Sequence, residues 1–321
     1  MSKFSLIAVV ATFLLAPCIT YPQAYPSRPI RLIVPSAAGG PPDIAARSLA
    51  SELTKQMGQQ VVVDNRPGAS GIIGLEMIAR SAPDGYTLGL IPNVIATNPR
   101  LYSKLPYDFA RDFQPVIHAT SGVNLLAITP SLPIRSVKEL IDHVRANPGK
   151  LSYGTSGLGA TTHLSMELLK SLTGTDIVLV SYKGMPQAIL DVIGGQIHMV
   201  CEAVLSILPH VRAGKVRALA VTSLKRLPLA PEVPTFDESG IPGYEITGWI
   251  GYAVPAGVPR NIVLQLNAEI NKAQLSPSLS KAIADRGGVA VGGTPEQFAE
   301  HVRRETEKLG KLIEAAGIKP Q

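Results

Sequence analysis

The chain has 321 residues, of which 45% are hydrophobic and 17% charged, and its formal net charge is +6. This length has room for about two domains, and the hydrophobic content is typical of a packed globular protein rather than a disordered one. The basic residues are scattered, and the aromatic residues (5%) are not interleaved with them, which argues against a nucleic-acid-binding surface.

The N-terminus has the pattern of a secretory signal peptide. Lys3 precedes an apolar run from Phe4 to Ala16, which is too short to cross a bilayer but suits a signal-peptide core. We predict cleavage after Ala24, which removes residues 1–24 and exports the protein to an aqueous compartment such as a bacterial periplasm. The mature chain then keeps one cysteine, Cys201, and forms no internal disulfide.

The first part of the chain alternates strands and helices. Its hydrophobic patterns predict a strand at 30–34, a helix from about Ile44 to Gly58, a buried strand at 61–63, a helix at 72–80 and a strand at 86–91. This βαβαβ order favours a mostly parallel sheet with helices on both faces.

The second part continues the alternation. Its predicted strands are at 125–129, 151–154, 177–180, 197–200 and 218–221, and its predicted helices begin near Val137, His163, Pro186 and Leu205. Ser136 and Glu139 form a capping box for the first of these helices, which ends at Asn147.

A proline-rich stretch from 228 to 259 contains one predicted strand, at 249–254, and three helices follow near 260–273, 276–286 and 295–315. We expect this strand to return the chain to the first domain, where the terminal helices pack. The predicted α/β protein therefore has one domain made of residues 25–124 and 247–321 and a second made of residues 125–246.

Two loops of small residues each follow a strand and precede a helix. A helix start presents unpaired backbone N–H groups and about half a positive charge, and small side chains let a ligand approach that backbone. Two such loops in different domains predict a clamp on a small anion, with one loop on each side. The candidate binding residues are Ser36, Ala38, Gly39, Gly40 and Asp43 in the first loop, and Ser156, Gly157, Gly159, Thr161 and Thr162 in the second.

Several of these residues also have a purely structural interpretation. The glycines supply turn geometry, although their duplication in two domains favours ligand binding. Asp43 is interpreted with equal weight as a helix cap or as a group that holds the loop, a water or a polar ligand group. Ser156, Thr161 and Thr162 are caps, hydroxyl donors to a carboxylate, or both.

Four further polar residues are interpreted individually. His163 is expected to pack at the helix start, Lys183 to lie in an ordinary turn, and Cys201 to be a small buried residue. Glu202 is a candidate specificity residue, because it lies near a strand end that faces the predicted cleft.

The sequence shows no catalytic or cofactor signature. Its histidines never pair at metal-ligand spacing, one cysteine cannot build a zinc site, and neither a Walker A motif nor G-x-G-x-x-G is present. The run from Gly154 to Leu158 resembles a nucleophile elbow around Ser156, but Leu158 replaces the required glycine. We therefore predict no catalytic residue, no metal and no cofactor, and keep a hydrolase that uses Ser156 as the alternative.

A set of ordered motifs runs through nearly all of the mature chain. The motifs are Tyr25-Pro26-Ser27-Arg28-Pro29-Ile30, the Gly39-Gly40-x-x-Asp43 loop, Val63-Asp64-Asn65-Arg66-Pro67-Gly68-Ala69, Pro83-Asp84-Gly85-Tyr86, Tyr153-Gly154-Thr155-Ser156-Gly157, Tyr182-Lys183-Gly184, Arg217-Ala218-Leu219-Ala220-Val221-Thr222 and Pro231-Glu232-Val233-Pro234-Thr235. Together they resemble the Bug family, the periplasmic solute-binding proteins of tripartite tricarboxylate transporters.

The resemblance implies a two-domain periplasmic-binding-protein (Venus flytrap) fold, type II-like, that encloses a small carboxylate between its domains. It implies a monomer that delivers its ligand to membrane transporter subunits and binds no nucleic acid. Binding in this family is dominated by the two glycine loops. This sequence departs from the family pattern at Ser36, at Pro41-Pro42, at Ser181, and at His198 and Val200-Cys201-Glu202.

The sequence therefore favours a non-enzymatic periplasmic receptor that closes on a small organic acid. A ligand-loaded sensor subunit for a membrane kinase is a second alternative to it. Dicarboxylates, tricarboxylates, acidic amino acids and aromatic acids all remain open as ligands, because pocket shape decides among them.

Overall fold

The structure is a computed structural model that describes residues 25–155, 159–182, 184–285, 287–318 and 320. Ser156, Gly157 and Lys183, which the sequence singled out, lie outside the described residues. Within the described part of the chain, no helix is both long and apolar enough to cross a membrane.

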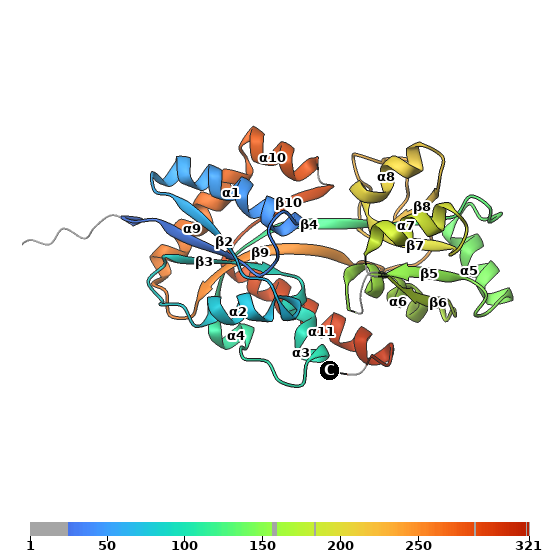
Figure 1. Ribbon diagram of the computed structural model, residues 1–321, viewed down its shortest axis with the longest axis horizontal. Helices are drawn as coiled ribbons and strands as arrows, with labels where there is room; N and C mark the ends of the chain where they lie inside the picture. Colours follow the sequence, from blue (N-terminus) through green and yellow to red (C-terminus); the bar gives the residue numbers. More distant parts are fainter. Residues whose placement is uncertain (1–24, 156–158, 183, 286, 319, 321) are drawn as a thin grey trace, which may run out of the picture.

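One curled sheet runs through the whole molecule (Figure 1). Its strands follow the order β2-β1-β3-β9-β4-β7-β5-β6, and β8 and β10 also pair with β4. The strands are β1 (Ile30–Val34), β2 (Val61–Asn65), β3 (Thr87–Pro92), β4 (Phe113–Ile128), β5 (Ser152–Thr155), β6 (Val178–Ser181), β7 (Met199–Ala203), β8 (Arg217–Val221), β9 (Thr247–Pro255) and β10 (Gly288–Gly292).

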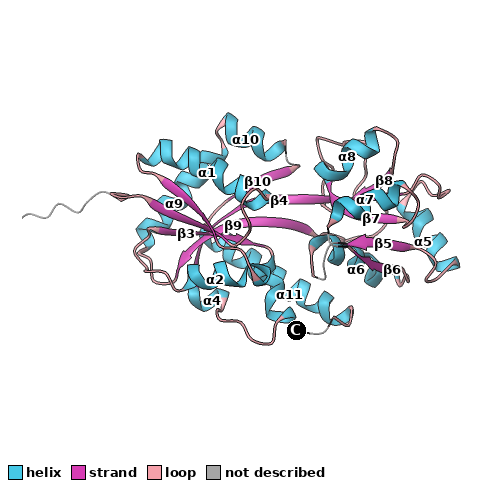
Figure 2. Cartoon of the chain, viewed as in Figure 1, coloured by secondary structure: helices cyan, strands magenta, loops and turns pink. Residues whose placement is uncertain are grey.

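Strands β4 and β9 join the two halves of the molecule, as Figure 2 shows. They pair antiparallel from Phe113 and Pro255 to Val123 and Thr247. Beyond Asn124, β4 pairs with β7 and β8 instead. One strand therefore belongs to both halves and connects them covalently.

Helices cover both faces of each half (Figure 1). One continuous apolar core joins α2, α3 and α11 to α5 and α6, a second lies under α1 and α9, and a third under α7 and α8. The helices are α1 (Pro41–Met57), α2 (Ile72–Ala79), α3 (Val94–Leu101), α4 (Phe109–Asp112), α5 (Val137–Ala146), α6 (Thr161–Thr173), α7 (Met185–Ile193), α8 (Val204–Arg212), α9 (Arg260–Gln274), α10 (Pro277–Ala284) and α11 (Pro295–Ala315).

Most predicted elements are present, but several expectations are wrong. Strands β1, β2 and β3 pair in parallel, as predicted. Strand β9, however, pairs antiparallel with both β3 and β4, so the sheet is mixed. The strand at 61–63 is only partly buried: Val61 is buried, but Val62 is 49% exposed, and β2 lies at the edge of the sheet. Ser136 caps α5, but Glu139 accepts a hydrogen bond from the Arg135 N–H, so the second half of the capping box is absent.

Other elements were missed. Helices α3 and α4 and strand β10 were not predicted, and β4 was expected only from residue 125. Pro115 and Gly122 interrupt the β pattern in the first part of β4. Pairing with β9 and β10 makes this segment a strand nonetheless, since neighbouring strands override local propensity.

An aromatic and imidazole cluster packs β4 and β9 against α11. His118 and His301 stack with ring centroids 4.1 Å apart, and Trp249 meets both rings edge-on. Burial lowers the pKa of each histidine to about 4, and the positive charges of Arg304 and Lys308 add to this effect at His301. Both imidazoles are therefore neutral at pH 7.

We expect the free energy of unfolding to fall as the pH drops from 6.5 to 4. Unfolded histidines bind a proton near pH 6.5, whereas the folded pair resists protonation down to about pH 4. The unfolded state therefore gains protons first, and each histidine adds a slope of up to ~1.4 kcal/mol per pH unit in this window. Denaturant unfolding at a series of pH values measures it.

His301→Phe removes one titrating group and keeps a ring in the cluster, so it should flatten the slope. His210→Gln on α8, away from this cluster, is the control and should leave the slope as in the wild type. A wild-type slope in His301→Phe would contradict the interpretation of this cluster.

Candidate functional site

A cavity of about 460 Å³ lies between the two halves of the molecule. The first half contributes Ser36 after β1, Ser70, and the start and end of α3, and the second half contributes Gly159 and Ala160 before α6. Both predicted loops therefore border one space. No described residue that lines it carries a charge, so a ligand anion there meets backbone groups, hydroxyls and amides.

The first loop is closed by the Asp43 side chain. Asp43 is 2% exposed, and its Oδ2 accepts hydrogen bonds from the Gly39 N–H (2.8 Å) and Arg47 Nε (3.0 Å). These hydrogen bonds, with a weaker one from Asn65, lower the pKa of Asp43 to about 2 against the opposing effect of burial. Asp43 therefore holds the loop as an ionised carboxylate; the N-cap position itself belongs to Gly40.

This geometry makes the first loop a weak anion site. Helix α1 begins at Pro41, before the predicted start, and Pro42 follows it. Two of the N–H groups that a helix start normally offers are thus absent, because proline has none. The Gly39 N–H is already bonded to Asp43. The charge of Asp43 further opposes a second anion at this end of the cleft.

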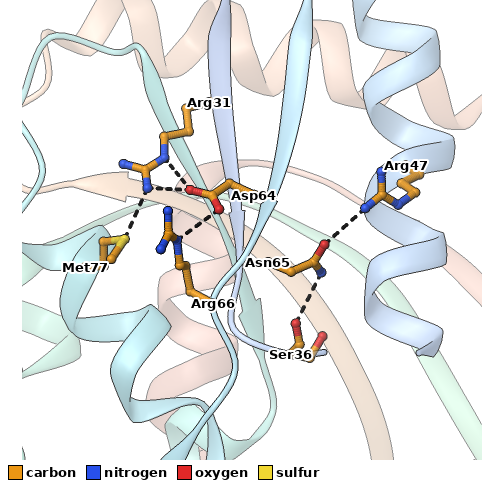
Figure 3. A network of polar contacts seen from close by, with 7 residues as sticks. All are labelled: Arg31, Ser36, Arg47, Asp64, Asn65, Arg66 and Met77. Atoms are coloured by element: carbon orange, nitrogen blue, oxygen red, sulfur yellow. Dashed lines mark hydrogen bonds and ion pairs between the residues drawn. The ribbon is translucent and has the colours of Figure 1, made fainter. Parts of the chain in front are cut away.

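A second network fixes the position of Ser36 (Figure 3). Asn65 at the end of β2 donates from Nδ2 to the Ser36 carbonyl oxygen (3.2 Å), and its Oδ1 accepts from Arg47 (3.1 Å). The Ser36 hydroxyl is buried and has no hydrogen-bond partner among the described residues. A buried unpaired hydroxyl that borders a cavity is a natural ligand contact.

The neighbouring residues of β2 form a separate ionic cluster (Figure 3). Asp64 lies between Arg31 and Arg66, and Arg31 also contacts the Met77 sulfur. Burial alone would raise the pKa of Asp64, but its hydrogen bonds to the two arginines outweigh burial and lower it. This cluster binds β2 to β1 and does not touch Ser36.

The second loop leads into α6, whose first turn is Thr161, Thr162 and His163. The N-cap is Ala160, and no side-chain hydrogen bond caps this helix start. The expectation that Thr161 or Thr162 caps the helix is therefore wrong. Thr162 instead places its hydroxyl 3.0 Å from that of Thr155. The N–H groups of the first turn have no acceptor within the helix, and Ala160 borders the cavity.

Gly159 and Gly40 differ in whether their backbone and surroundings would accept a larger side chain. Gly159 has a φ of +77°, and a Cβ there would lie 2.5 Å from the Leu101 side chain of the opposite half. Gly40 has an ordinary φ of −77°, and a Cβ there would make only van der Waals contacts. The positive φ of Gly159 therefore favours glycine, and a Cβ there would make the Leu101 side chain shift. Gly39 also has a positive φ, of +80°, which supports its role in the turn.

The remaining predicted residues lie in less direct positions. His163 is 2% exposed and accepts the Gly159 N–H at Nδ1, so its predicted packing role is confirmed. Cys201 is buried, as predicted. Ala38 is exposed and borders neither this cavity nor a second cavity, which lies behind the start of α1.

Glu202 is 7% exposed and borders neither of these cavities. Burial raises the pKa of Glu202, while hydrogen bonds with the Ala203 backbone and Ser206 at the start of α8 oppose the shift. One of its carboxylate oxygens has no partner among the described residues. A role for Glu202 in ligand specificity stays a prediction.

Sequence reasoning missed several residues that border the cavity, among them Ser70, Asn93 and Tyr102. Ser70 and Ala69 both have a positive φ, and Ser70 is hydrogen-bonded to the Tyr102 hydroxyl (2.7 Å). Two consecutive non-glycine residues in this conformation mark a constrained site. The run Pro67-Gly68-Ala69-Ser70-Gly71 predicted a loop, but nothing in it signalled proximity to Gly159.

The fold, with a cavity between its two halves, is that of the two-domain solute-binding proteins. The protein is similar to the Polaromonas TctC solute-binding protein (TM-score 0.81, 29% identity, 91% of this chain and 99% of that one). It is also similar to an R. palustris protein solved with adipate (TM-score 0.78, 38% identity, 92% and 100%).

A third similar structure is MatC from Rhodopseudomonas palustris with bound malate (TM-score 0.71, 30% identity, 90% and 100%). In sequence, BugT of Bordetella pertussis is 35% identical over 99% of both chains. A protein from the tcbD-tcbE intergenic region of Pseudomonas sp. strain P51 is 40% identical over 91% of this chain and 87% of its own. Residues 45–318 match the tripartite tricarboxylate transporter family receptor, and the chain belongs to that family.

We expect Asn65→Ala to weaken ligand binding with little loss of stability. It removes the bond that positions the Ser36 carbonyl, a change of about 0.5–1.5 kcal/mol. Asn65→Asp keeps the acceptor for Arg47 but loses the donor to Ser36, so it should weaken binding to a similar extent. Calorimetric titration with adipate, together with thermal unfolding, measures both quantities.

Arg66→Gln is the matched control, because it breaks the neighbouring ionic cluster without touching Ser36. It should leave affinity unchanged even where it lowers the melting temperature. Equal affinity of Asn65→Ala and the wild type would show that the position of Ser36 does not matter for binding.

Proposed function

We propose that this protein is the receptor that captures a small organic carboxylate for a tripartite tricarboxylate-type transporter. Membership of the receptor family supports this proposal, as do the relatives solved with adipate and with malate. The observation that carries it is a neutral cavity between the two halves that opens onto the uncapped start of α6.

We place the ligand carboxylate at α6 rather than at α1. The first turn of α6 keeps its N–H groups and the positive end of its dipole, whereas α1 has two prolines and a buried carboxylate there. The Ser36 hydroxyl lines the opposite wall of the same cavity and supplies a polar contact. The two loops therefore differ in role: one holds the charge and the other orients the ligand.

Ligand capture requires the halves to move, and we propose residues 25–124 and 247–321 as one domain and residues 125–246 as the other. The crossing from one to the other falls where β4 changes partners, next to the facing glycines Gly122 and Gly248. Contacts with both loops favour the closed arrangement.

We also propose that the protein acts without catalysis, as a monomer, and that residues 1–24 are a signal peptide that takes it to the periplasm. The family supports a binding role: one similar structure is described as that of the periplasmic binding protein BugD. Its further partners are membrane subunits of the transporter.

The first test of this function is the preference for a charged ligand. A helix-start site should favour a carboxylate over its amide by about 1.5–3 kcal/mol, the range for hydrogen bonds to charged groups. Calorimetry with adipate and adipamide, and with hexanoate and hexanamide, measures the difference. Equal binding of acid and amide, or hydrolysis of esters by the purified protein, would contradict the proposal.

The second test removes one backbone donor. Thr161 is the first residue of α6, a position that proline favours, and Ala160 before it has the extended backbone that proline requires. Thr161→Pro should therefore fold normally, yet it deletes one N–H and should weaken carboxylate binding about tenfold or more.

Thr161→Ala is the control, since it keeps the N–H and removes only the side-chain hydroxyl and methyl. It should bind more tightly than Thr161→Pro. If both variants bound the carboxylate equally well, the α6 start would not be the carboxylate site.

A further inference from the structure

A second cavity, of about 310 Å³, lies behind the start of α1 and is mainly apolar. Leu49 of α1, Ile250 and Tyr252 of β9, Ile270 of α9, and Leu279 and Ile283 of α10 form its walls. None of its described lining residues is charged, and its buried amide, Gln274, already donates to the Ala119 carbonyl oxygen. An apolar cavity of about 150 Å³ is enough to hold benzene, so this one has room for a hydrocarbon group.

This cavity adjoins the interdomain cavity. The two spaces share three lining residues, Pro42, Pro92 and Asn93, which lie at the boundary between them. Ala203, from the second half of the molecule, also borders the apolar cavity. The cavity is therefore part of the space between the halves and is not confined to the first core.

The start of α6 lies close to one wall of the apolar cavity. Gly248 lines the apolar cavity, and a Cβ on Gly248 would lie 3.9 Å from the Thr161 methyl group. A carboxylate held by the first turn of α6 is consequently within reach of a hydrocarbon chain placed between α1 and α10.

The α1 end of the interdomain cavity, opposite the start of α6, disfavours binding of a second anion. The two prolines of α1 remove two of the helix-start N–H donors there, the Asp43 side chain is ionised, and no described lining residue of either cavity is cationic. A second carboxylate would lose its hydration without gaining a charged partner. A methyl or aryl end avoids this desolvation and buries apolar surface.

From this arrangement we infer that the receptor selects carboxylates with one charged end and an apolar body, which occupies the cavity between α1, α9 and α10. This inference rests on the proposed function and specifies its ligand class. A second carboxylate on the ligand lowers affinity, and each added methylene raises it until the cavity is full.

Calorimetric titration with straight-chain monocarboxylates from propanoate to octanoate, and with adipate, tests the selection. Burying a methylene contributes ~0.8 kcal/mol, so affinity should rise about fourfold per carbon. Hexanoate should bind at least tenfold more tightly than adipate, which has the same number of carbons. Adipate binding as tightly as hexanoate, with no gain along the series, would overturn the inference while leaving the carboxylate receptor intact.

Filling the apolar cavity with a larger side chain tests whether the hydrocarbon chain of the ligand lies there. Ala282 on α10 lines it, so Ala282→Phe should abolish the gain from propanoate to octanoate while preserving propanoate binding. Ala284→Phe, at an exposed position of the same helix, is the matched control and should keep the gain. Ala45→Phe on α1 fills the same space from the opposite wall and serves if Ala282→Phe does not fold.

If a folded variant with a filled cavity kept the full gain in affinity from propanoate to octanoate, the hydrocarbon chain of the ligand would lie elsewhere. That result would overturn the inference. Failure of every carboxylate to bind the wild-type protein would instead refute the proposed function itself.

Discussion

The antiparallel pairing of β4 with β9 is the interaction on which the rest of the structure depends. It extends from Phe113 and Pro255 to Val123 and Thr247, and beyond it β4 continues into the second half. These two strands connect the halves. They also bring Gly159, which follows a strand far along the chain, beside Leu101 of the first half. Without this pairing the two loops would share no cavity.

Within that frame the two loops are chemically unequal, although they look alike in sequence. At α1 the available charge is negative, because Asp43 is buried and its pKa is about 2. At α6 the first turn carries no capping side chain. Asp43 is paired with Arg47 rather than with a ligand group, and Arg47 also contacts Asn65. This difference between the loops is the basis for proposing the α6 start as the carboxylate site.

Local patterns predicted much of the fold. The periodicity of α1 and of the terminal helices, the stop at Gly58 and the cap at Ser136 appear as expected, because these signals act within a few residues. Prediction failed where distant pairing decides: the first part of β4, the exposed face of β2, and β10. The cavity lining shows the same division: Ser36 and Gly159 border the cavity and were selected from their loops, whereas Asn93 and Tyr102 border it and were not selected.

The sequence by itself determined the family, the two-loop plan and most of the helices, because motifs and periodicity are local properties. Only the tertiary structure showed that the Asp43 carboxylate accepts the Gly39 N–H of its own loop, because this contact depends on how the loop folds back on α1. It also decided that an apolar cavity lies beside the cleft, because the cavity's walls come from α1, β9, α9 and α10 together. Side chains far apart in the chain form such a space only when the sheet brings them together, and no local pattern encodes it.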